Sequence, residues 1–339
     1  MTTEPAASPA AEQARSLRIV RLAAAVLCVF GGVVVIWSYF QFIVVFPAPT
    51  VLAITAELPL LVIGFLVLRV LRPVRNPRLV WSAAATIWGG SAAIGCAVLA
   101  NQGLISLWAK TAGVNFAANW SDSLSAPLNE EILKLCGVVM VVLAAPGLIK
   151  GPLDGMVFGA LTGLGFQVVE NVTYGLDNIV QSGATAPVRA VTYSYLVRLT
   201  TALGSHWTMT AVAGAGIGYL VLYGRSRRGV LTALTCLIVA MGMHLLFNAP
   251  DVFSGIKVAV NFIAVAALYA TLTDSYLNRA RGVLSRYAQA GRVTDCEATE
   301  LLSRIARQRE LREAGSESDR EAVRARQDDV LGSVEADAA

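Results

Sequence analysis

Long apolar runs recur along the chain and are separated by short polar connections. A membrane-spanning helix needs about 20 mostly apolar residues. Eight segments approach or reach this length, at 22–46, 51–71, 79–100, 128–146, 152–174, 199–223, 229–248 and 256–275. The pattern therefore predicts an all-α fold, a polytopic transmembrane bundle of about eight spanning helices. Only two connections, 101–127 and 175–198, are long enough to form extended loops.

The two ends of the chain differ from this apolar region, residues 22–275. Residues 1–21 begin with a stretch rich in Ala, Pro, Glu and Ser, which predicts a disordered N-terminal segment. Residues 276–339 form a charged C-terminal tail. Thr294 and Glu297 have the spacing of a capping box, which predicts a tail helix reaching about Ala314. Its alternating charges favour a solvated helix without chemistry.

Composition supports membrane insertion. Hydrophobic residues make up 55% of the chain and charged residues 15%, with a mean hydropathy of +0.61. Soluble domains carry about 25% charged residues, so this composition excludes a soluble enzyme. The tail contains 12 of the 23 acidic residues. A carboxylate inside an apolar segment elsewhere in the chain therefore needs a specific reason.

Basic residues predict how the helices are oriented. Fourteen Arg and Lys residues lie in alternate connections, beginning with the segment before the first span, whereas the opposite connections contain four. Cytoplasmic connections are the ones enriched in Arg and Lys. Both termini are therefore predicted to be cytoplasmic.

Several charged residues lie at the ends of apolar segments. Glu130 and Glu131 follow Asn129, a plausible N-cap, and Lys134 is placed to pair with Glu130. Alone, this turn is equally typical of an interfacial cap with a surface ion pair. Glu170 lies near the predicted end of the fifth span, where a lone glutamate is often interfacial.

Both histidines of the chain lie in apolar segments. His206 belongs to the sixth predicted span and His244 to the seventh, where Asn248 shares its helix face. A lone buried histidine is usually a satisfied core group. However, alternating helix directions would bring all these groups to a similar depth in the outer leaflet. The pattern therefore predicts one shared site, formed by Glu130, Glu131, Glu170, His206 and His244.

Two other features lie within predicted spans. Gly155, Gly159 and Gly163 form a stripe of small residues, which favours close packing of a neighbouring helix. Glu57 lies in the outer half of the second span, and an interfacial position is the preferred interpretation.

Glutamates and histidines grouped in a low-dielectric cavity suit proton transfer near neutral pH. A glutamate could take a proton from water and a histidine could protonate a leaving amine, while the second histidine or Asn248 could stabilise an oxyanion. The same residue types bind zinc, and Glu170, His206 and His244 would make such a site with an open position for water. The sequence leaves metal-free and zinc-assisted water activation open. The HExxH, GxGD and GxSG motifs of other intramembrane proteases do not occur.

At these residues the chain resembles the PrsW family of intramembrane proteases, which is related to the type II CAAX prenyl endopeptidases. Four motifs within residues 127–250 carry the resemblance. They are EExxK at Glu130–Lys134, FxxxEN at Phe166–Asn171, His206 with Gly214 beyond it, and HxxxN at His244–Asn248. The CAAX branch has Arg in the first motif and His in place of the second-motif glutamate, so both differences favour PrsW.

The resemblance implies an endopeptidase that cleaves a membrane-anchored protein, such as an anti-sigma factor, in the plasma membrane. It assigns catalysis to the five site residues and supporting roles to Lys134, Asn171 and Asn248. The implied partners are this substrate and the lipid bilayer, without a nucleic acid. Two alternatives stay open: a proton-coupled transporter, which would need an inverted repeat that the sequence does not show, and a catalytically inactive membrane scaffold.

Overall fold

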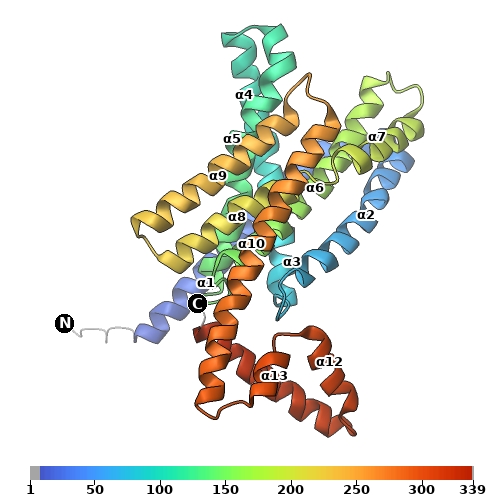
Figure 1. Cartoon of the computed structure of the whole chain (residues 1–339). Helices are drawn as coiled ribbons and strands as arrows, with labels where there is room; N and C mark the ends of the chain where they lie inside the picture. The colour runs from blue at the N-terminus through green and yellow to red at the C-terminus, as the bar shows by residue number, and fades with distance from the viewer. Residues whose placement is uncertain (1–7, 338–339) are drawn as a thin grey trace, which may run out of the picture.

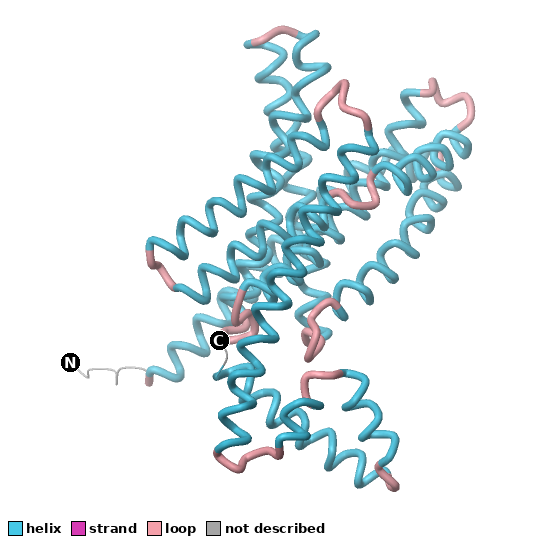
Figure 2. The backbone as a smooth tube through the Cα atoms, viewed as in Figure 1, coloured by secondary structure: helices cyan, strands magenta, loops and turns pink. Residues whose placement is uncertain are grey.

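The computed structural model describes residues 8–337, and within this range the regular elements are all helical (Figures 1 and 2). In chain order, these elements are α1 (Pro9–Val45), α2 (Pro47–Val70), α3 (Leu79–Trp88), the π-helix η1 (Gly89–Ala93), α4 (Ile94–Thr111), α5 (Val114–Ala144), α6 (Pro152–Gln181), α7 (Pro187–Thr201), α8 (His206–Tyr223), α9 (Arg227–Asn248), α10 (Ser254–Gln289), α11 (Asp295–Glu300), α12 (Arg304–Glu313) and α13 (Glu317–Asp337).

Six helical segments of the described chain are long and apolar enough to cross a membrane. They are α1, α2, the continuous run Leu79–Thr111, α6, α9 and α10. The other two predicted spans are also helices, α5 and α8, and both carry polar groups within the bundle. The fold is therefore the predicted all-α polytopic bundle.

The two long loops predicted from the sequence are wrong. Residues 101–111 continue α4 and residues 114–127 begin α5, so they form a helical hairpin that projects from one end of the bundle (Figure 1). Residues 175–181 complete α6, and α7 occupies most of the second predicted loop. Apolar runs mark only the part of a helix that lipid can cover, whereas backbone hydrogen bonding continues beyond it.

The N-terminal segment is also more ordered than predicted. Helix α1 begins at Pro9, and the hydroxyl of Ser8 accepts a hydrogen bond from the Ala11 amide at 3.3 Å. Residues 9–21 of the predicted disordered segment are therefore helical. Residues 1–7 lie outside the described part of the chain.

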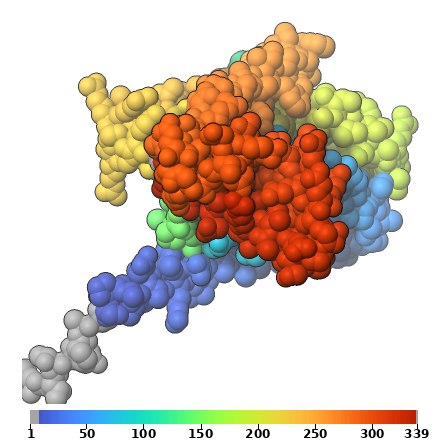
Figure 3. Space-filling view, turned by 60° about the horizontal axis from the view of Figure 1, so that its bottom comes forward, coloured from blue at the N-terminus to red at the C-terminus, as the bar shows by residue number. Residues whose placement is uncertain are grey.

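The tail folds into a small helical unit at the end of α10. Its apolar core joins Leu284 and Leu331 to Val74 of the α2–α3 connection. Figure 3 shows the tail helices covering the centre of this face of the molecule. The Thr294–Glu297 capping box is present, but α11 ends at Glu300. The predicted single helix is therefore divided into α11 and α12.

Helix α6 lies at the centre of the bundle, since 94% of the residues in its most apolar 18-residue stretch are buried. Its glycine stripe packs directly against α8. A Cβ added at Gly155, Gly159 or Gly163 would clash with the backbone of Gly214, Thr210 or His206, respectively. The predicted close approach is therefore present, and it places His206 beside α6.

We expect Gly159→Ala to lower the free energy of unfolding by about 1–3 kcal/mol, because the added methyl group overpacks this helix pair. Gly242→Ala is the matched control, since nothing lies within 4 Å of a Cβ at that position of α9. Thermal unfolding in detergent would compare the two variants. A Gly159→Ala protein as stable as the control would contradict the tight α6–α8 contact.

Candidate active site

The first motif lies inside a long helix rather than at its start. Helix α5 begins at Val114 and includes Pro127, so Asn129 is not an N-cap. Glu130 and Glu131 therefore project from mid-helix into the bundle, where they are 3% and 0% exposed. The interpretation of this turn as an interfacial cap is wrong.

The other site residues come from three neighbouring helices. Glu170 lies inside α6, well before its end at Gln181. His206 is the first residue of α8, rather than two turns into a helix, because a turn at 202–205 separates α7 from α8. His244 lies near the end of α9, as predicted. The structure brings these three residues together with Glu130 and Glu131.

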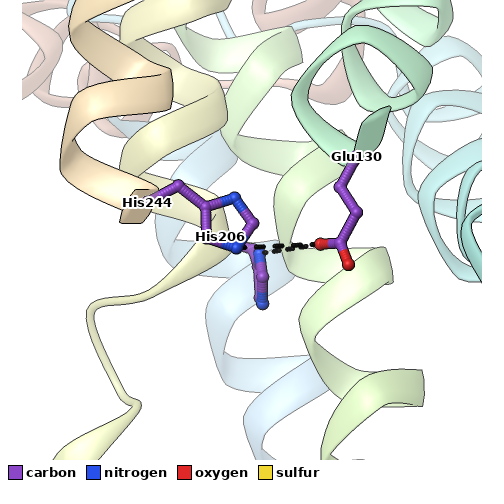
Figure 4. A group of neighbouring side chains, drawn as sticks. All are labelled: Glu130, His206 and His244. Atoms are coloured by element: carbon purple, nitrogen blue, oxygen red, sulfur yellow. Dashed lines mark ion pairs between the residues drawn. The ribbon is translucent and has the colours of Figure 1, made fainter. Parts of the chain in front are cut away.

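Glu130 and the two histidines face one another across a shared space (Figure 4). The Oε2 atom of Glu130 lies 3.8 Å from His244 Nε2 and 4.0 Å from His206 Nδ1. Among the described residues, neither Glu130 Oε2 nor His244 Nε2 has a hydrogen-bond partner. An unsatisfied buried polar atom costs about 1–3 kcal/mol. These opposed atoms therefore mark a place suited to a water molecule or an ion.

The remaining nitrogen of each imidazole ring is held by a carboxylate. His206 Nε2 lies 2.8 Å from Glu170 Oε2, and His244 Nδ1 lies 2.9 Å from Glu131 Oε1. If each of these nitrogens donates its proton to the carboxylate, the other nitrogen of each ring keeps a lone pair, at His244 Nε2 opposite Glu130 and at His206 Nδ1 beside Lys134 Nζ. Carboxylates orient metal-binding histidines in this way.

This arrangement differs from the predicted ligand set. The sequence combined Glu170 with His206 and His244, but Glu170 lies on the far nitrogen of His206. Glu130 takes its place, since one oxygen of Glu130 and one nitrogen of each histidine lie within 4.8 Å of one another.

Lys134 is fully buried among these groups. Its Nζ lies 2.6 Å from Glu131 Oε1, 2.9 Å from His206 Nδ1 and 3.8 Å from Glu130 Oε2. The predicted pairing with Glu130 is therefore the weaker one. A buried charge is tolerated when it is paired and hydrogen-bonded, and the adjacent carboxylates meet that need for Lys134.

A second layer of polar contacts surrounds Glu170. Arg198 of α7 donates to Glu170 Oε2 at 2.8 Å and also to the side-chain oxygen of Asn171. Asn171 in turn donates to Glu57 Oε2 at 3.0 Å. Glu57 is 4% exposed, so its predicted interfacial position is wrong. The sequence shows Arg198 only as an isolated basic residue, without a signal for this role.

Two further side chains donate hydrogen bonds to the glutamates, whereas Asn248, a predicted supporting residue, does not. Asn101 donates to Glu130 Oε1 at 2.9 Å, and Thr210 donates to Glu131 Oε2 at 3.1 Å. Thr210 lies one turn after His206, a spacing that could have revealed it. Asn248 instead donates to the Asp122 carbonyl at 3.3 Å, so it does not face the cluster as an oxyanion donor.

The grouped atoms suit zinc by type, because two imidazole nitrogens and a carboxylate oxygen leave a fourth position for water. Their carboxylate partners and the two unpaired atoms support this fit. His206 Nδ1 already accepts a hydrogen bond from Lys134 Nζ. An ion at this position would require Lys134 to give up that bond and to keep its contact with Glu131.

One of three comparisons with known proteins gave a match. The model of the PrsW family intramembrane metalloprotease matches residues 77–272, which is more than half of the chain. The matched region contains Glu130, Glu131, Glu170, His206 and His244. Neither the curated proteins nor the solved structures gave a significant match. The chain therefore belongs to the PrsW family of intramembrane metalloproteases.

Proposed function

We propose that this membrane protease hydrolyses a peptide bond of a membrane-anchored protein at the space between Glu130, His206 and His244. The observation that carries the proposal is the pair of buried, unpartnered atoms, Glu130 Oε2 and His244 Nε2, facing each other. A single-pass regulator such as an anti-sigma factor is the proposed kind of substrate. Membership of a peptidase family supports hydrolysis over the transporter hypothesis.

In the metal-free form of this mechanism, Glu130 accepts the proton of the attacking water. Its Oε1 is fixed by Asn101, so Oε2 is oriented towards the shared space. A positioned general base contributes about 10²–10⁴-fold to a rate. The proton then passes to the leaving amine. Glu131 and Glu170 hold the two imidazole rings in place rather than reacting themselves.

In a zinc-assisted form, Glu130, His206 and His244 would hold the metal, so Glu130 would be a ligand and not the proton acceptor. Zinc bound there would polarise the scissile carbonyl and lower the pKa of its bound water to about 7. The chain's own contribution is then to hold the ligands, through the hydrogen bonds that Asn101, Glu131 and Glu170 make with them.

The proposed location is the outer leaflet of the plasma membrane, with both termini cytoplasmic. His206 begins α8 and His244 lies near the end of α9, and these helix ends lie in the part of the bundle away from the tail (Figure 1). The first turns of α1 lie at the tail end. The excess of basic residues at that end supports its cytoplasmic placement.

Chelation and zinc analysis in proteoliposomes would test the metal-assisted form. We expect about one zinc per chain in the wild type, and loss of both zinc and cleavage after chelation or in His244→Ala. Added zinc should restore the chelated wild type but not the variant. Zinc-free wild-type protein that cleaves its substrate despite a chelator would restrict the mechanism to Glu130 and the histidines alone.

A further inference from the structure

A second polar cavity lies at the tail end of the bundle, opposite the proposed active site. It has a volume of about 390 Å³ and is bounded by α1, the α2–α3 connection, the α5–α6 connection and α13. Its lining includes five cationic side chains, Arg21, Arg72, Arg75, Arg78 and Lys150, against the two carboxylates of Asp154 and Glu335.

Both carboxylates are already engaged within the protein. Arg72 Nε lies 2.6 Å from Asp154 Oδ1, and an Arg72 terminal nitrogen lies 3.0 Å from Glu335 Oε1. These three side chains are less than 10% exposed. Arg78 and Lys150 make no ion pair with any described residue. The cavity therefore keeps an excess of positive charge that an anion would neutralise.

The cavity also borders the apolar surface of the bundle. Trp81 forms part of its wall, with the Arg21 guanidinium 5.5 Å from the ring centroid. The residues adjacent in sequence to its rim are apolar and exposed: Leu22 by 66%, Leu79 by 58% and Val80 by 73%. An anionic group bound in this cavity would thus lie next to a lipid-facing surface of the protein.

We propose that this cavity binds the phosphate headgroup of an anionic phospholipid from the cytoplasmic leaflet. Arginine and lysine side chains recognise phosphate through charge-assisted hydrogen bonds. Basic pockets between helices on the cytoplasmic side of membrane proteins bind anionic headgroups in the same way. The acyl chains would lie along Leu22 and Val80. Glu335 of α13 forms part of the wall, so the docked tail completes the cavity.

Binding would be measured with the full chain in a neutral detergent. The ligands are dioctanoyl phosphatidylglycerol, dioctanoyl phosphatidylcholine and glycerol phosphate. The second ligand is a lipid without net charge, and the third carries the phosphate without acyl chains. The test variant is Arg78→Gln/Lys150→Gln. The matched control is Arg225→Gln/Arg227→Gln, which removes the same charge from exposed residues just before and at the start of α9, away from the cavity.

We expect wild-type protein to bind phosphatidylglycerol more tightly than the other two ligands. The Arg78→Gln/Lys150→Gln variant should raise its Kd at least about tenfold, corresponding to about 1.4 kcal/mol, with little change in the control. Unchanged thermal unfolding of both variants would show that they remain folded. An equal rise in the Kd for phosphatidylglycerol in both variants would overturn the proposal. Wild-type protein that binds phosphatidylcholine as tightly as phosphatidylglycerol would also overturn it. Glycerol phosphate binding as tightly as the lipid would reassign the cavity to a soluble phosphate ester.

Discussion

Replacing Glu130 with glutamine should reduce cleavage of a membrane-anchored substrate by about 10²–10⁴-fold while leaving the protein folded. Glutamine has the same shape but cannot accept the proton of the attacking water. Glu130 Oε2 has no hydrogen-bond partner among the described residues, so few structural contacts are lost. Initial cleavage rates in proteoliposomes, together with thermal unfolding of the same preparations, would measure both effects.

Glu317→Gln provides the control for this experiment, because its side chain is 75% exposed on α13 and lies far from the cluster. It should cleave at the wild-type rate. A Glu130→Gln protein that remains folded and cleaves as fast as this control would remove Glu130 from the reaction. The proposed mechanism would then have no proton acceptor.

Replacing Lys134 with methionine should destabilise the protein by about 3–5 kcal/mol. This is the usual cost of removing one partner of a buried ion pair, since the carboxylate left behind is uncompensated. Glu131 Oε1 would lose its contact at 2.6 Å, and Glu131 is completely buried. Chemical unfolding in detergent, compared with Lys110→Met on the exposed surface of α4, would measure the loss.

A double variant separates this electrostatic effect from a packing effect. If the loss comes from an unpaired carboxylate, Lys134→Met/Glu131→Gln should be more stable than Lys134→Met alone. If the two substitutions instead add, the cost of removing Lys134 would come from its other contacts, such as the Phe166 ring 4.4 Å from its Nζ.

Hydrophobic patterning predicted where the helices lie, but not where they end. Each of the eight apolar segments corresponds to helical structure, and six of these helices are long and apolar enough to cross a membrane. The α4–α5 hairpin and α7 lie where loops were predicted, since polar helices carry no apolar run. The break before His206 was also missed, because residues 199–205 continue the apolar pattern of the next span.

The convergence of the site residues could be predicted, but their pairing could not. Alternating helix direction brought Glu130, Glu131, Glu170, His206 and His244 to one depth. Adjacent residues differ by about 100° around a helix, so a single sequence does not show which glutamate faces which histidine. Glu130 lies on α5 and Glu170 on α6, so which of them faces the open nitrogens depends on how these two helices are rotated in the packed bundle. Arg198 joins the cluster through the tertiary packing of α7, and no local sequence pattern indicates this contact.

The tight glycine contact between α6 and α8 also limits how a substrate reaches the catalytic group. A helix with its side chains is about 10–12 Å wide, whereas the two backbones touch at Gly155, Gly159 and Gly163. A transmembrane segment cannot slide through that seam without separating the helix that carries His206 from the one that carries Glu170. If the proposed site is the catalytic one, a substrate segment would have to enter between other helices, with the α6–α8 pair staying closed.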